Sequence, residues 1–179
     1  MQTTPVLSKP SKLLTCSAMC LALCLVLPFL TGQIPQIGSA LCPMHLPVLL
    51  CGFLCGPWWA LLVGATAPLL RHLLFSMPPL LTAIAMSFEL AAYGAVSGLL
   101  YRKLPKNGAG IYISLITAMV VGRILWGIVR VAMTGVSGET FTWAMFLAGA
   151  FTTAIPGIVL QLLLIPALVV AFRRVKLIQ

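Results

Sequence analysis

Six apolar runs divide this sequence, and basic residues gather beside the first, after the fourth and after the last of them. The runs cover approximately residues 13–30, 46–55, 58–75, 81–101, 111–133 and 143–172. A helix needs roughly 20 mainly apolar residues to cross a bilayer, so most of these runs have the length of a transmembrane helix. Only 7% of the 179 residues are charged, against about a quarter in soluble domains. We therefore predict one all-α membrane domain over residues 1–179, a bundle of six transmembrane helices, with no room for a soluble catalytic or nucleotide-binding domain.

The distribution of basic residues predicts how the bundle is oriented. Basic residues in short loops stay on the cytoplasmic side of a membrane, and an even number of crossings places all the basic clusters there. The net charge of +9 does not indicate a nucleic-acid partner, because the clusters are not interleaved with aromatic residues. We predict that both termini are cytoplasmic and that the loops after the first, third and fifth runs lie outside. The clusters hold eight of the eleven Lys and Arg residues: Lys9 and Lys12; Arg102, Lys103 and Lys106; Arg173, Arg174 and Lys176.

Two of the runs admit another interpretation. The first follows a basic leader, so a cleaved signal peptide is an alternative to a retained helix. Its apolar stretch is longer than a usual signal core and no small-x-small cleavage site follows it, which favours the retained helix. The run over residues 46–55 is short for a full crossing, so we expect it to be tilted or extended by backbone of the preceding loop.

Arginines within the fifth apolar run are candidate binding residues. A charge at the centre of a transmembrane helix costs about 2.5–3.5 kcal/mol on insertion scales, so such residues usually face a cavity or a partner. Arg123 and Arg130 are seven residues apart, which is two helical turns, and Trp126 and Gly127 lie between them on the same face. This face combines two cations, an aromatic side chain and a position without a side chain.

Four polar positions on neighbouring runs extend this group. Glu89 lies near the middle of the fourth run, Tyr93 follows it one turn later, and Arg71 and His72 lie near the outer end of the third run. One intramembrane acid against three arginines leaves a surplus of about two positive charges. A carboxylate ligand would relieve this surplus, because guanidinium binds carboxylate bidentately. The alternative is that Glu89 pairs with one arginine only to fix two helices together, or that Arg71 reaches lipid headgroups.

Other motifs do not indicate catalysis or metal binding. Cysteines recur every four residues from Cys16 to Cys24 and from Cys51 to Cys55, a spacing at which cysteine acts as a small apolar residue, with copper handling as the alternative. The string from Gly135 to Gly138 matches that of rhomboid-type serine proteases, but a histidine base downstream of Ser137 is lacking. This string also falls in a predicted turn over residues 134–142. We predict no enzyme activity, no metal site and no cofactor.

Several short motifs resemble one family of membrane proteins. Ala18 and Ala22 are small residues four positions apart, which lets another helix approach closely. The run from His45 to Leu50 is followed by Gly52, Gly56-Pro57, Gly64 and Pro68-Leu69-Leu70-Arg71, and later by Ala85-Met86-Ser87-Phe88-Glu89 and Tyr93-Gly94. Together with the small size, the six segments and the basic ends, these motifs resemble the substrate-binding S components of energy-coupling factor (ECF) vitamin transporters. Within that family the sequence looks most like the pantothenate-type members.

The resemblance implies a function, a partner and a location. It implies a subunit that captures a small vitamin or precursor near the outer face of the bacterial plasma membrane and topples to release it inside. It implies a partner, the ECF module of one membrane scaffold subunit and two ATPases, which Ala18 and Ala22 would contact. Alternatives are an S component for pyridoxine or hydroxymethylpyrimidine, an ion-coupled secondary carrier for a small organic anion, and a structural protein. The residues expected to bind the substrate are Arg123, Arg130, Trp126, Glu89, Arg71, His72, His45 and Tyr93.

Overall fold

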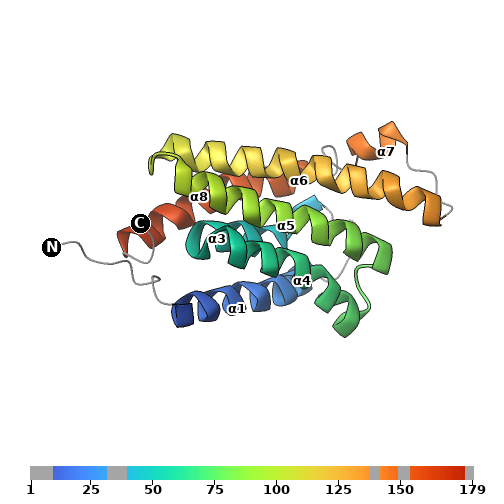
Figure 1. Ribbon diagram of the computed structural model, residues 1–179, viewed down its shortest axis with the longest axis horizontal. Coiled ribbons are helices and arrows are strands. Elements are labelled where there is room, and N and C mark those ends of the chain that lie inside the picture. The colour runs from blue at the N-terminus through green and yellow to red at the C-terminus, as the bar shows by residue number, and fades with distance from the viewer. Residues whose placement is uncertain (1–9, 32–39, 138–141, 149–153, 176–179) are drawn as a thin grey trace.

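Long apolar helices make up the structure, because a chain in lipid must satisfy its backbone hydrogen bonds within each segment. The computed structural model describes residues 10–31, 40–137, 142–148 and 154–175. Figure 1 shows the long helices lying side by side, with the first residues of α1 and the last residues of α8 at the same end of the bundle. The elements are α1 (Pro10–Val26), the 3₁₀ helix η2 (Leu27–Thr31), α3 (His45–Cys55), α4 (Pro57–Phe75), α5 (Leu80–Lys103), α6 (Gly108–Ser137), α7 (Trp143–Leu147) and α8 (Ile155–Arg174).

Five of these helical segments are long and apolar enough to cross a membrane, and α3 is shorter. With 11 residues, α3 rises about 16 Å, roughly half of the 30 Å hydrocarbon core. Gly56 ends α3 with a φ of 92°, and Pro57 begins α4 immediately after it. Positive φ costs glycine little, and proline suits the first turn of a helix. The short second segment predicted from the sequence is therefore one arm of a tight helical hairpin with α4.

The centre of the bundle is α5, which packs against α3, α4 and α6. At two points α4 and α5 approach each other through glycines. A Cβ on Gly64 would lie 2.4 Å from the Leu90 carbonyl group, and one on Gly94 would lie 2.6 Å from the Ala60 carbonyl oxygen. Such close approach is how helices associate in lipid, where small residues permit backbone contact. The tight pairing of α4 with α5 fixes the depth at which α5 presents Glu89.

Replacement of Gly94 by alanine is expected to destabilise the bundle. The added methyl group meets Ala60 backbone atoms that cannot move without shifting α4, so we expect a loss of about 1–3 kcal/mol. The measurement is the midpoint of thermal unfolding in nanodiscs. Gly108→Ala is the matched control, because no atom lies within 4 Å of a Cβ placed there. Equal midpoints for the two variants would contradict the close α4–α5 contact.

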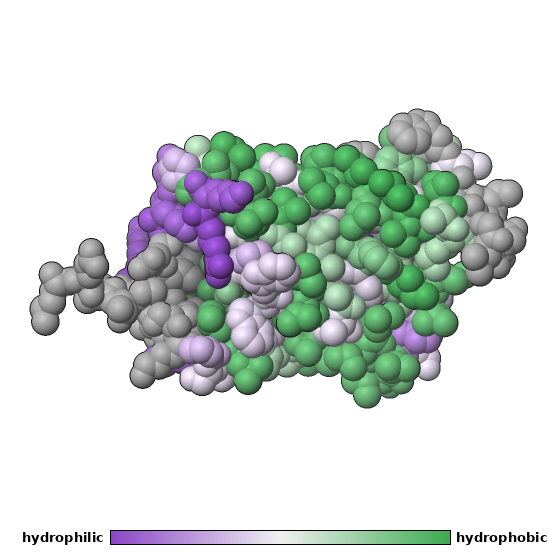
Figure 2. Space-filling view, in the orientation of Figure 1, coloured by the Kyte–Doolittle hydropathy of each residue, from purple (hydrophilic) through white to green (hydrophobic). Residues whose placement is uncertain are grey.

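The basic residues that the structure describes at the α5–α6 turn and at the end of α8 lie at one end of the bundle. Arg173 donates a hydrogen bond to the Lys106 carbonyl oxygen, and Arg102 donates to the Cys55 carbonyl oxygen at 3.4 Å. Figure 2 shows hydrophilic side chains gathered where α5 passes into α6, beside a broad apolar flank. Two of the clusters predicted to share the cytoplasmic side therefore contact each other directly.

The second half of the chain differs from the predicted segments in two places. Helix α6 continues to Ser137, so part of the predicted turn over residues 134–142 is helical and the Gly135–Gly138 string begins within a helix; Gly138 lies outside the described residues. The predicted sixth segment, residues 143–172, is divided into α7 and α8. Pro156 lies in the first turn of α8, where a proline is favoured because it cannot continue a preceding helix.

Candidate functional site

A buried carboxylate on α5 forms the centre of the site. Glu89 is 1% exposed, and its Oε1 lies 2.9 Å from Nη1 of Arg123 on α6 and 3.3 Å from Nε2 of His45 at the start of α3. The chain has two acids, and Glu89 is the one within the described residues. Both described ion pairs therefore share the same carboxylate oxygen. The sequence left open which arginine pairs with Glu89, and the structure shows that it is Arg123.

Tyr93 completes this group, which we call the Glu89 centre (Glu89, Tyr93, His45 and Arg123). Tyr93 is 1% exposed and lies one turn after Glu89 on α5, close enough to interact with its carboxylate. Its ring meets the His45 imidazole edge-on, with centroids 5.1 Å apart. Gly122 on α6 makes room for the ring, because a Cβ there would lie 2.1 Å from two ring carbons. The structure thus brings together four of the residues that were predicted from three separate runs.

Arg123 is also fixed from the chain that precedes α3. Its Nη2 donates a hydrogen bond to the Cys42 sulfur at 3.6 Å, and the Cys42 thiol is 7% exposed. Cys42 has a φ of 48°, a left-handed conformation that few residues other than glycine adopt. Its carbonyl oxygen accepts the His45 backbone N–H at 3.0 Å. One strained residue therefore contacts both Arg123 and the backbone of His45.

Further along α6, Trp126 and Gly127 lie against α7, and Arg130 follows them one turn later. Arg130 is half-buried and takes part in neither described ion pair of Glu89. The ring of Phe146 on α7 stacks on Trp126, with centroids 6.2 Å apart, and lies over Gly127, where a Cβ would be 2.4 Å from the ring. Helix α7 therefore covers the part of the α6 face that the sequence predicted to bind substrate.

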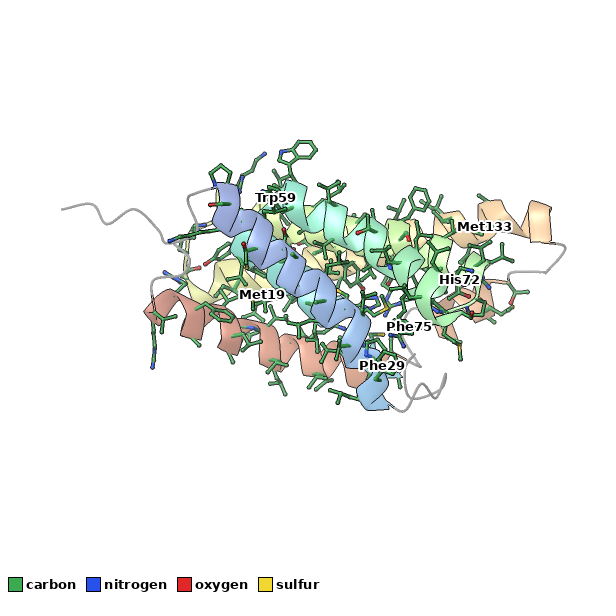
Figure 3. The ribbon with its side chains drawn as sticks, turned by 90° about the horizontal axis from the view of Figure 1, so that it is seen from below. Met19, Phe29, Trp59, His72, Phe75 and Met133 are labelled. Carbon is green, nitrogen blue, oxygen red and sulfur yellow. The ribbon has the colours of Figure 1, made fainter. Side chains whose placement is uncertain are left out.

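Arg71 has contacts of a different kind. It is 3% exposed, and its Nη1 donates to the Leu25 carbonyl oxygen at 2.5 Å. The guanidinium group lies over the rings of Phe29 and Phe75, 4.9 and 5.4 Å from their centroids. Figure 3 shows these two rings side by side where η2 meets the end of α4. Arg71 therefore joins the end of the first segment to α4, and its part in ligand binding stays a prediction.

His72 lies beside it but contacts the α4–α5 turn. Its Nδ1 donates a hydrogen bond to the Pro78 carbonyl oxygen at 2.8 Å. The imidazole is half-buried at the same end of the bundle as Phe75 (Figure 3). This contact orders the turn, and a contribution of His72 to binding also stays a prediction.

Sequence reasoning missed four residues near these groups: Cys42, Gly122, Phe146 and Gln161. Gln161 on α8 is 1% exposed, and its Oε1 has no hydrogen-bond partner within the described residues. A lone amide in an apolar run is unusual in a membrane, so Gln161 could have been identified as a candidate from the sequence. The other three had none, because their roles depend on which helices become neighbours.

Two members of the Glu89 centre keep buried nitrogen atoms that form no hydrogen bond to the described residues. They are His45 Nδ1 and Arg123 Nε. Buried polar atoms are nearly always hydrogen-bonded in folded proteins, so such atoms at a polar centre indicate a position for a ligand or water. Within the described residues, no group of three or more His, Cys, Asp or Glu side chains is arranged to hold a metal ion.

Ala18 and Ala22 lie away from this centre, on an open face of α1. Both are exposed, as are Leu14 and Met19, whereas Cys20 and Cys24 on the other side of the helix are buried. Helix α1 packs against α3 and α4 on its buried side (Figure 1). Its outward face is therefore apolar, has two small residues at its middle, and is uncovered by the described part of the chain.

Comparison with known families agrees with this arrangement. The family model described as "ECF transporter, substrate-specific component" matches residues 12–169. Neither the search of curated proteins nor the search of solved structures finds a match. Substrate-specific (S) components are non-catalytic, multi-pass membrane subunits that bind a substrate and pair with an ECF module. The matched region contains every helix that contributes to the Glu89 centre, and this chain belongs to the ECF transporter S-component family.

Proposed function

We propose that the chain captures a small vitamin or vitamin precursor carrying a carboxylate, such as pantothenate, from outside the cell. Delivery inward then depends on an ECF module of a scaffold subunit and two ATPases. The observation that carries this proposal is the Glu89 centre, a cluster of charged and polar groups buried within an apolar bundle. Such groups are costly in a membrane and are usually functional.

The charges of the bundle support an anionic ligand. Three arginines of the described helices, Arg71, Arg123 and Arg130, lie away from the basic clusters at the helix ends, and the whole chain has two acids. Counting both acids against the three arginines still leaves one positive charge, before any proton on the histidines. We assign the ligand carboxylate to the neighbourhood of Arg130, which shares a face of α6 with Arg123 and Trp126. Guanidinium recognises a carboxylate there through a pair of charge-assisted hydrogen bonds.

The aromatic residues nearby give a reason to retain pyridoxine and hydroxymethylpyrimidine as alternatives. Tyr93 and Trp126 offer ring surfaces along the α5–α6 contact. A flat heteroaromatic ligand gains from stacking on such surfaces and needs no carboxylate. Binding of a carboxylate ligand should therefore depend on Arg130, whereas binding of a heteroaromatic ligand should not.

Equilibrium binding to the purified chain in nanodiscs tests the proposal. The panel is pantothenate, its primary amide, pyridoxine and hydroxymethylpyrimidine. We expect Arg130→Gln to weaken pantothenate by about 10–100-fold, since a hydrogen bond to a charged group contributes about 1.5–3 kcal/mol. The amide should lose only a few-fold. Arg174→Gln, which removes an exposed charge at the opposite end of the bundle, should change neither.

Three results would count against the proposal. Equal losses for pantothenate and its amide would show that Arg130 is structural. Tighter binding of either heteroaromatic compound would favour the alternative ligand class. Uptake by the chain alone, driven by an ion gradient in liposomes without ATPases, would indicate a secondary carrier.

A further inference from the structure

Gln161 is the one amide side chain within the helices that the structure describes. It is 1% exposed, and its Oε1 is buried without a hydrogen-bond donor in the described part of the chain. An amide that served only to join helices would have its oxygen bonded to a neighbouring helix, because an unmade buried hydrogen bond costs free energy. The unpaired oxygen therefore needs another explanation.

The packing of α8 places the start of that helix beside the residues that precede α3. A Cβ on Gly157 would lie 2.7 and 2.8 Å from the carbonyl oxygens of Ala40 and Leu41, just before α3. Helices α3 and α8 run in the same direction, toward the end where Cys55 and Arg173 contact the α5–α6 turn. Gln161 lies one turn further along α8 than Gly157, and His45 begins α3 four residues after Leu41.

The buried face of α8 also points toward the helices that supply the Glu89 centre. Gly157, Gln161 and Ile165 are buried at intervals of four residues, so they share one face. Helix α8 packs against α3 and α6, which carry His45 and Arg123. Three buried polar atoms from three adjacent helices thus have no hydrogen-bond partner among the described residues: His45 Nδ1, Arg123 Nε and Gln161 Oε1.

We propose that Gln161 is a further ligand-binding residue, whose amide oxygen accepts a hydrogen bond from a neutral donor on the ligand. This inference rests on the proposed function and narrows the substrate class. The ligand carries, besides its anionic group, a hydroxyl or amide N–H some distance from it. A simple alkyl carboxylate would leave the Gln161 oxygen unpaired and is a poor substrate.

Thermal unfolding without ligand gives the first test, using the full chain in nanodiscs. Gln161→Leu removes an acceptor that has no donor in the ligand-free state, so we expect its unfolding midpoint to rise by a few degrees. Ile165→Val, on the same face one turn further inward, should lower the midpoint slightly because it leaves a small void. A lower midpoint for Gln161→Leu than for the unmodified chain would overturn the proposal, since it would reveal an internal donor.

Binding of pantothenate and its two deoxy analogues, in which each hydroxyl in turn is replaced by hydrogen, gives the second test. The unmodified chain should bind one analogue about 10–100-fold more weakly than pantothenate, as expected for an unpaired buried acceptor. Gln161→Leu should bind pantothenate and that analogue equally. If Gln161→Leu still binds the analogue more weakly than pantothenate, the proposed role of Gln161 is wrong, even where Arg130→Gln behaves as proposed. If Gln161→Leu loses this discrimination while the unmodified chain binds pantothenate and its amide equally, the result supports the role of Gln161 and rejects an anionic ligand.

Discussion

Replacement of Glu89 by glutamine is expected to destabilise the protein by about 3–5 kcal/mol and to abolish ligand binding, since breaking a buried ion pair leaves an uncompensated charge. Arg123 is 8% exposed and lies 2.9 Å from Glu89, so its charge would remain in an apolar bundle without this partner. The measurements are the thermal unfolding midpoint and equilibrium binding in nanodiscs. Ser87→Ala is the control, because this buried hydroxyl of α5 bonds to Ala83 within its own helix and should contribute about 1 kcal/mol or less.

The double variant Glu89→Gln with Arg123→Gln separates stability from binding. Removing both charges of a buried pair is often nearly neutral for stability, so we expect most of the lost stability to return. Binding should not return, because His45 and Tyr93 would no longer face a carboxylate. Recovery of binding in the double variant would show that the Glu89 centre only holds α5 to α6.

Replacing Ala18 and Ala22 together by leucine is expected to abolish transport and leave ligand binding unchanged. The two alanines are exposed on α1, on the face opposite its buried cysteines. Larger side chains keep that face apolar but prevent another helix from approaching closely. If each leucine weakens the complex by about 1.4 kcal/mol, its affinity falls roughly 100-fold. Copurification with the ECF module and ATP-dependent uptake in proteoliposomes measure the effect.

The matched control is Ala132→Leu, which enlarges an exposed alanine of α6. It should leave both copurification and uptake unchanged. A double leucine variant that still copurifies with the module at wild-type yield would show that another face of the bundle meets the scaffold subunit. Loss of ligand binding in that variant would instead indicate that the substitutions disturb the fold.

Much of the fold followed from the sequence because hydropathy in a membrane protein reports directly on segment length. The first four long spans and the short α3 agree with the apolar runs to within a few residues. The division between α7 and α8 was not predicted, since residues 143–172 are apolar throughout and hydropathy does not distinguish a break within such a run. The end of α6 was set too early, because Thr134 was read as the start of a turn, although α6 continues to Ser137.

The site was harder to predict, because side-chain partners depend on which helices become neighbours. The intramembrane charge of Glu89 indicated a partner arginine, but the choice of Arg123 depends on Cys42 and on the space left by Gly122. Arg71 has the same sequence signal as Arg123, yet it packs between Phe29 and Phe75. Counting charges in a sequence therefore finds candidates but does not assign their partners.

The brevity of α3 has a consequence for how the chain is inserted during synthesis. Eleven residues are too few for independent insertion as a transmembrane segment, so we expect α3 to enter as one arm of a hairpin with α4, turning at Gly56. His45 then arrives first, Glu89 follows with α5, and Arg123 comes only with α6. The acid therefore has its full set of partners only after the fifth crossing is made. The Glu89 centre is consequently assembled late in biogenesis, and Gln161 joins it only when α8 enters as the last segment.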